Sequence, residues 1–162
     1  MSYPEPRYQG EPGLVNAAFR PATQAAELTY PSGGTVHYLA TGASTNGQFG
    51  LYRWKMAAAQ SGPEPHFHRT ISESFYVLSG TIRLFDGKQW IDGVPGDFLF
   101  VPEGGIHAFR NESGEPASML ILFAPGAPRE DYFETTAKLA GGLVLSDEEK
   151  AAFYLRHDTY WR

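Results

Sequence analysis

Glycine and proline recur along the whole chain and divide its apolar residues into short runs. The 162 residues include 18 glycines and 12 prolines, which are spread out rather than pooled in a linker. Short apolar runs between turn residues are typical of β-sandwiches and β-barrels, because each run supplies one strand. A chain of this length fits one domain with a sizeable core. We therefore predict a single all-β domain.

The turn residues also predict where the strands lie. Asp86-Gly87 is a strong signal for a two-residue hairpin, because both positions of such a turn favour positive φ. The runs expected to form strands are 35–40, 48–58, 75–78, 81–85, 89–91, 98–101, 107–111 and 118–123.

The C-terminal segment changes its periodicity. Residues 130–139 lack strand alternation and predict a helix. Ser146 and Glu149 form a capping box, in which the serine hydroxyl accepts from an early helix N–H and the glutamate reaches back. A second short helix should therefore run to about Arg156. The expected organisation is an N-terminal arm packing on the barrel (1–30), a β-barrel (31–125) and a short α-helical C-terminal tail (126–162).

Composition limits the possible partners. The net charge of −5 and the pI of about 5.5 predict no nucleic-acid binding. The longest apolar run, 119–124, is too short to span a bilayer, and the first residues lack the apolar core of a signal peptide. The absence of cysteine removes disulfides and thiolate chemistry and fits a reducing compartment. We therefore expect a cytoplasmic protein that does not bind membranes.

Oligomeric state is predicted from the arm and from the barrel edges. An open barrel leaves edge strands with unpaired N–H and C=O groups, which must be covered or paired. The arm has apolar points that could add a strand to its own barrel or to a neighbour's. Two-fold pairing is the commonest closed symmetry, so we expect a homodimer. The alternative is a monomer whose arm and tail cover its own edges.

Two histidines, His66 and His68, have the spacing of a metal site. Alternate side chains of a strand share a face, so both imidazoles can reach one ion at about 2.0–2.1 Å. Glu73 follows at an odd offset, so residues 69–72 must bend to return it to the same face. His107 is the first residue of the predicted strand 107–111, and it is the fourth candidate metal ligand. For His37 and His157 we expect ordinary surface or core roles, because neither has a partner at ligand spacing.

These residues resemble the two sequence motifs of the cupin superfamily. The first motif is matched by His66-x-His68-x4-Glu73-x6-Gly80, with Gly62 closer to the first histidine than the usual leading glycine. The second is matched at every named position by Gly96-x5-Pro102-x-Gly104-x2-His107-x3-Asn111. The resemblance implies a jelly-roll, double-stranded β-barrel with a metal in its interior. It also implies the ligands His66, His68, Glu73 and His107.

Three imidazoles and one carboxylate suit Fe, Mn, Ni, Co or Zn as a single divalent ion, and they leave coordination positions open. Glu73 could remain a ligand or act as the catalytic base. Alternation places several aromatic side chains on inward faces, where most should fill the core. Those expected to line a substrate pocket beside the metal are Tyr52, Trp54, Phe75 and Phe109.

Among cupins with a metal, the chain is most similar to single-barrel quercetinase-like dioxygenases. The similarity lies in the His-x-His-x4-Glu spacing and in the aromatic-rich stretch after the last barrel strand. It implies O2-dependent cleavage of an enol or flavonol-like small molecule. A fold alone does not select a reaction. A non-catalytic small-molecule binding or sensing protein, and an isomerase or polyketide cyclase, therefore stay open as alternatives.

Overall fold

The structure is a computed structural model that describes residues 2–58 and 62–162. The first residue of the expected arm, and residues 59–61 of the expected barrel, lie outside the described residues. The elements in chain order are β1 (Leu28–Thr29), β2 (Thr35–Ala40), β3 (Gly50–Met56), β4 (His66–Phe67), β5 (Ser72–Ser79), β6 (Ile82–Phe85), β7 (Trp90–Gly93), β8 (Phe98–Val101), β9 (Ala108–Arg110), β10 (Ala117–Ala124), α1 (Arg129–Ala140), α2 (Asp147–Arg156) and β11 (Tyr160–Trp161).

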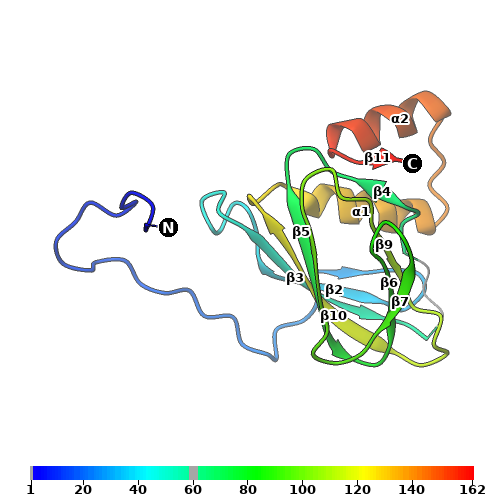
Figure 1. Cartoon of the computed structure of the whole chain (residues 1–162), viewed down its shortest axis with the longest axis horizontal. Coiled ribbons are helices and arrows are strands. Elements are labelled where there is room, and N and C mark those ends of the chain that lie inside the picture. Colours follow the sequence, from blue (N-terminus) through cyan, green and yellow to red (C-terminus); the bar gives the residue numbers. More distant parts are fainter. Residues whose placement is uncertain (1, 59–61) are drawn as a thin grey trace.

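The strands form two facing layers of an antiparallel jelly-roll barrel, as predicted. The larger layer has the order β1-β2-β3-β10-β5-β8. The other layer contains β7-β6-β9 and the pair β11-β4. The backbones of His66 and His107 exchange two hydrogen bonds of 3.0 and 2.9 Å, and this bridge joins β4 to the start of β9. In Figure 1, β6, β7 and β9 lie on the side of the barrel away from the N-terminal arm.

The core lies between the layers and is built by side chains that alternate along β3 and β10. Tyr52 and Trp54 face inward from β3, and they lie opposite Ile121 and Met119 of β10. Arg53 between them is only partly buried, and Lys55 after Trp54 is exposed. Burying a large apolar side chain contributes about 1.5–3 kcal/mol each, so this two-residue period fixes the register of the central strands.

The hairpin between β6 and β7 differs by one residue from the prediction. The amide of Asp86 donates to the carbonyl of Gln89, so the central turn positions are Gly87 and Lys88. Gly87 has φ of 91°, which glycine tolerates. The Asp86 carboxylate accepts from the amides of Lys88 and Gln89, both at 2.8 Å. Asp86 therefore stabilises the turn through its side chain and does not adopt positive φ itself.

The arm is mostly exposed, and Figure 1 shows it running away from the barrel. Only its last part joins the fold, where β1 pairs with β2 at the edge of the larger layer. This pairing matches one of the two possibilities expected for the arm, a strand added to the chain's own barrel.

The tail contains both predicted helices, and the capping box of Ser146 and Glu149 is present. It is not wholly helical, however, because it continues into β11, which pairs with β4. A two-residue strand is too short for its periodicity to be visible in a sequence. Neither helix of the described chain has the length and apolarity needed to cross a membrane.

Candidate metal centre

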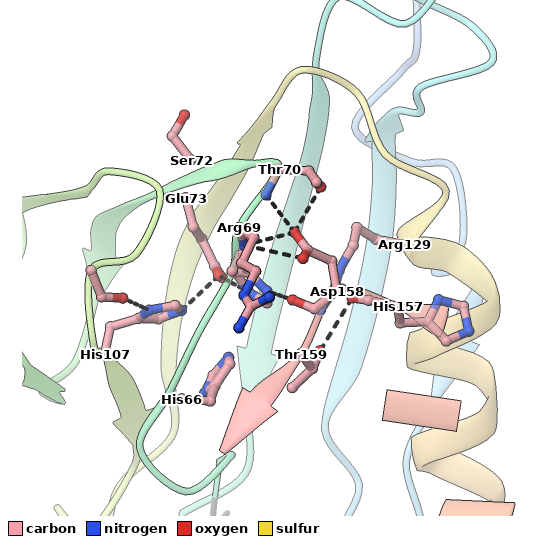
Figure 2. A network of polar contacts seen from close by, with 12 residues as sticks. His66, Arg69, Thr70, Ser72, Glu73, His107, Arg129, His157, Asp158 and Thr159 are labelled. Atoms are coloured by element: carbon pink, nitrogen blue, oxygen red, sulfur yellow. Dashed lines mark hydrogen bonds and ion pairs between the residues drawn. The ribbon is translucent and has the colours of Figure 1, made fainter. Parts of the chain in front are cut away.

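The four candidate ligands converge at the junction of the two layers. His66 lies in β4, His68 directly follows it, Glu73 lies in β5 and His107 directly precedes β9. All four side chains are buried, with at most 4% of their surface exposed. One candidate ligand atom from each lies within 4.8 Å of the others. Figure 2 shows the side chains of His66, Glu73 and His107 turned toward a common point.

The bend that returns Glu73 to the interior is present, as predicted. The chain leaves β4 of one layer after Phe67 and enters β5 of the other layer at Ser72. The carboxylate of Asp158 holds this crossing, because it accepts from the amides of Arg69 and Thr70 and from the Thr70 hydroxyl. The link is therefore fixed by a residue of the tail.

Backbone carbonyls fix the tautomer of each imidazole. Nδ1 of His66 lies 2.8 Å from the Glu64 carbonyl oxygen, Nδ1 of His68 lies 2.6 Å from that of Asp158, and Nδ1 of His107 lies 3.0 Å from that of Gly105. A carbonyl can only accept, so each Nδ1 carries a proton and donates it. Each Nε2 is left as the ligand atom, which is the arrangement usual for metal-binding histidines.

Glu73 is the negative centre of the cluster. Its Oε2 lies 2.8 Å from Nε2 of His107 and 3.2 Å from Nε2 of His68. Burial alone would raise the pKa of Glu73, but the charges and hydrogen bonds of His107 and His68 outweigh it and hold that pKa far below its usual range. Glu73 is therefore a carboxylate at neutral pH.

Burial disfavours the charged forms of both His66 and His107, but their pKa values shift in opposite directions. Burial, aided by the charge of His107, lowers the pKa of His66 to about 3. Burial also disfavours the charged form of His107, but the Glu73 carboxylate outweighs it and raises the pKa of His107. In the metal-free protein the Glu73 carboxylate thus favours the protonated form of His107. A cation can take the place of that proton, because metal ligands bind in their deprotonated forms.

The donor set fits a divalent transition metal. Three Nε2 atoms and one carboxylate, all buried and with orientation fixed by hydrogen bonds, provide nitrogen and oxygen donors without sulfur. Such a set suits Fe, Mn, Ni, Co or Zn. The chemistry of the residues therefore agrees with the metal expected from the sequence.

A cavity of about 380 Å³ opens beside the cluster, and His66 and Glu73 are part of its wall. Trp54 and Phe109 line it, as the alternation of the strands suggested. Its other aromatic lining residues are Tyr30, Phe123, Tyr132, Phe133, Tyr154 and Trp161.

Two of the four residues expected in the pocket are not in its wall. Tyr52 is fully buried, and its hydroxyl donates to the carboxylate of Glu130. Phe75 is also fully buried and packs with ring centroids 5.6 Å from Phe109 and 5.9 Å from His107, so it supports the cluster without lining the cavity. Alternation gives the face of a side chain but not its depth in the barrel.

Sequence reasoning missed the contribution of the tail to the cavity. Arg129 and Tyr132 of α1, Tyr154 of α2 and Trp161 of β11 all line it. One signal was available: Arg129 is the first residue of its helix, where the helix dipole favours acidic side chains over basic ones.

The remaining two histidines stay outside the cluster, as expected. His37 is buried in β2. His157 is also buried, and its Nε2 lies 3.1 Å from the Asp131 carboxylate. Burial is the main cause that lowers the pKa of both residues.

Known proteins resemble this chain in sequence. A family model described as a cupin domain matches residues 52–123. Quercetin 2,3-dioxygenase of Bacillus subtilis (strain 168) is 30% identical over 113 residues, which are 67% of this chain and 31% of that protein. The chain thus spans less than a third of the dioxygenase's length.

Solved structures also share the fold. KdgF from a Halomonas species superposes with a TM-score of 0.59 at 18% identity, covering 73% of this chain and 99% of that one. A sugar phosphate isomerase from a cupin superfamily, from Silicibacter pomeroyi DSS-3, has a TM-score of 0.50 at 26% identity, covering 57% of this chain and 59% of that one.

Proposed function

We propose, from the premise that this chain is a small cupin, that it is a metal-dependent enzyme acting on a small oxygenated or aromatic molecule. One observation carries the proposal. A buried cluster of three histidines and one carboxylate opens onto a cavity whose wall is largely aromatic. Such a cavity accommodates one small ring system beside the cluster.

The residues of the chain have distinct roles in this proposal. His66, His68, Glu73 and His107 would hold the ion, which supplies Lewis acidity that lowers the pKa of a bound hydroxyl and stabilises the resulting oxyanion. The Glu73 carboxylate is ionised and lines the cavity, so it can accept that hydroxyl proton. The aromatic wall excludes water and orients the ring of the substrate.

Within this class we favour an O2-dependent dioxygenase of the quercetinase type. The support is the 30% identity to the Bacillus enzyme together with the ring-sized aromatic cavity. The test is O2 uptake by protein loaded separately with each candidate metal, in the presence of flavonol and enol substrates. We expect O2 consumption and substrate loss in air, and neither under anaerobic conditions.

An isomerase is the second candidate, supported by the 26% identity to the Silicibacter structure. Substrate conversion that continues without O2, with a product of unchanged mass, would select it. Tight substrate binding with no conversion in air or under nitrogen would instead select a non-catalytic binding or sensing role.

Glu73→Gln should lose turnover even where metal is retained. The amide keeps the size of the side chain and one oxygen donor, but it cannot accept a proton as the carboxylate does. We expect kcat to fall by about 100-fold or more, while elemental analysis still finds metal. Unchanged turnover in the metal-loaded variant would remove Glu73 from the proton-transfer role.

We also propose that the protein is a homodimer. β8 is an edge strand of the larger layer, and Phe98 and Phe100 on its outer face are exposed beside Tyr76 of β5. The arm exposes further apolar side chains at Leu14, Val15 and Phe19. Clusters of exposed apolar side chains commonly mark protein interfaces.

Light scattering at micromolar concentration should give the dimer mass for the intact chain. A chain that lacks residues 2–26 tests the arm, and Phe98→Ser with Phe100→Ser tests the edge. A monomeric mass for the intact chain would refute the dimer. A monomeric mass for only one variant would assign the interface to the changed surface.

A further inference from the structure

We propose that Arg129 binds an anionic group of the substrate, a carboxylate, at the end of the cavity formed by the tail. The inference rests on the proposed function in one respect, because it takes the cavity beside the metal cluster as the substrate site. It adds the substrate class: a small ring or enol compound that carries a carboxylate.

Arg129 is a buried cation in the wall of the same cavity as His66 and Glu73. Only 3% of its surface is exposed. Figure 2 shows it reaching from the α1 side toward the segment that carries His157 and Asp158. Arginine is almost never buried to this extent unless its charge is paired.

The hydrogen-bonding capacity of Arg129 is largely unused. A guanidinium has five N–H donors, and the hydrogen bond found for this one is from Nη1 to the carbonyl of His157, at 2.8 Å. Its Nε is buried without a partner, and no ion pair with a carboxylate is found for it among residues 2–58 and 62–162.

The acidic neighbours of Arg129 in α1 have other partners. The Glu130 carboxylate accepts from Tyr52, and the Asp131 carboxylate lies against His157 and Arg156. An unpaired buried charge is unfavourable, so a ligand that supplies a carboxylate makes an ion pair that the described part of the protein itself does not make.

Aromatic rings hold the guanidinium in place without using its donors. Its central carbon lies 4.1 Å from the centroid of Tyr132 and 5.0 Å from that of Phe123. Stacking of this kind stabilises the cation through the faces of the rings. It leaves the N–H edge of the planar fork available for the two oxygens of a carboxylate, the geometry in which arginine binds most strongly.

The position of Phe123 relates Arg129 to the metal cluster. The Phe123 ring lies 6.4 Å from the imidazole of His68, and its backbone pairs with Glu73. The guanidinium is therefore about one aromatic ring away from the candidate ligands. A substrate of one ring can place its carboxylate on Arg129 and a ring oxygen at the cluster. With a divalent ion bound, Glu73 is the only negative side chain in the described wall, so the cavity has excess positive charge.

The test compares benzoate with benzamide, which have nearly the same shape but differ in charge. Affinity is measured by calorimetry for metal-free and for metal-loaded wild type, Arg129→Lys and Arg129→Gln. Arg83→Gln is the matched control, because Arg83 pairs with surface carboxylates outside this cavity. In parallel, the side-chain Nε–H resonance of Arg129, assigned by its loss in Arg129→Lys, is followed by NMR in the wild-type protein.

We expect wild type and Arg83→Gln to bind benzoate at least about 10-fold more tightly than benzamide, with or without metal. Arg129→Gln should lose this preference, and Arg129→Lys should keep part of it. Benzoate, but not benzamide, should shift the Arg129 resonance, a result that is read in the wild-type protein and needs only the conservative Arg129→Lys variant for its assignment.

Absence of a preference in the wild type, or no shift of the Arg129 resonance by benzoate, would overturn the inference. A preference that is present only with metal and survives in Arg129→Gln would also overturn it, because the carboxylate would then be bound by the ion. The metal-free measurements do not depend on the metal centre. A failure of the proposed enzyme function would appear separately, as absent metal binding or absent turnover.

Discussion

Replacing His66 and His68 together with alanine should abolish stoichiometric metal binding. The two residues supply two of the three buried imidazoles, and each is held in its binding tautomer by a backbone carbonyl. The remaining Glu73 and His107 provide only two donors, too few to hold a transition metal tightly in a buried site. We expect a loss of affinity of more than about 1000-fold, measured by elemental analysis after dialysis against a weak chelator.

His37→Ala is the control for this prediction, because His37 is a buried histidine of β2 outside the cluster. It should retain one metal equivalent per chain. In the double variant, thermal unfolding should also become insensitive to added metal, whereas metal should raise the Tm of the wild type, because an ion that binds only the folded state stabilises that state. A full metal equivalent in the double variant would show that the ligands lie elsewhere.

Removing the side chain of Asp158 should weaken metal binding by about 10–100-fold, although this residue is not a ligand. Its carboxylate holds the amides of Arg69 and Thr70, and its carbonyl accepts from Nδ1 of His68. Burial alone would raise the pKa of Asp158, but the hydrogen bonds from Thr70 and Arg69 outweigh it and lower that pKa. Without the carboxylate, the bend between His68 and Glu73 loses the contacts that fix it.

The substitution must separate lost hydrogen bonds from backbone strain, since Asp158 has φ of 53°. Asp158→Gly removes the carboxylate and accepts this φ, whereas Asp158→Asn also tolerates the conformation and keeps one acceptor oxygen. We expect the glycine variant to show the full effect and the asparagine variant a smaller one, in metal titrations followed by fluorescence. Equal affinities for wild type and the glycine variant would show that the tail does not position His68.

The barrel and the cluster were predictable because their determinants are local in the sequence. Short apolar runs between turn residues predicted the longer strands of both layers, but not the two-residue strands β1, β4 and β11. The pair His66 and His68 lies within one short segment, so its spacing alone brings two imidazoles together. Glu73 and His107 were located through the resemblance to known motifs, and the structure places both within reach of the pair.

The residues that escaped prediction depend on contacts between distant parts of the chain. Arg129 lies just before the predicted helix of residues 130–139, and it is the packing of the tail against the barrel that buries its side chain. Asp158 and Trp161 lie about 90 residues after the segment that they contact, and nothing in their local sequence indicates a partner. Alternation along β3 gave the inward face of Tyr52 and Trp54, but only three-dimensional packing decides that Trp54 reaches the cavity.

The pairing of β11 with β4 has a consequence for the order in which the protein is made. All four candidate ligands and the strands of both layers other than β11 have left the ribosome once residue 124 has emerged, but Asp158 and Trp161, which contact His68 and His66, come later. At about 5–20 residues per second, the 34 residues up to Asp158 take about 2–7 s. During this interval the nascent barrel contains its donors without the tail that helps to wall the cavity. The candidate metal cluster is therefore open from that side until the tail has been synthesised.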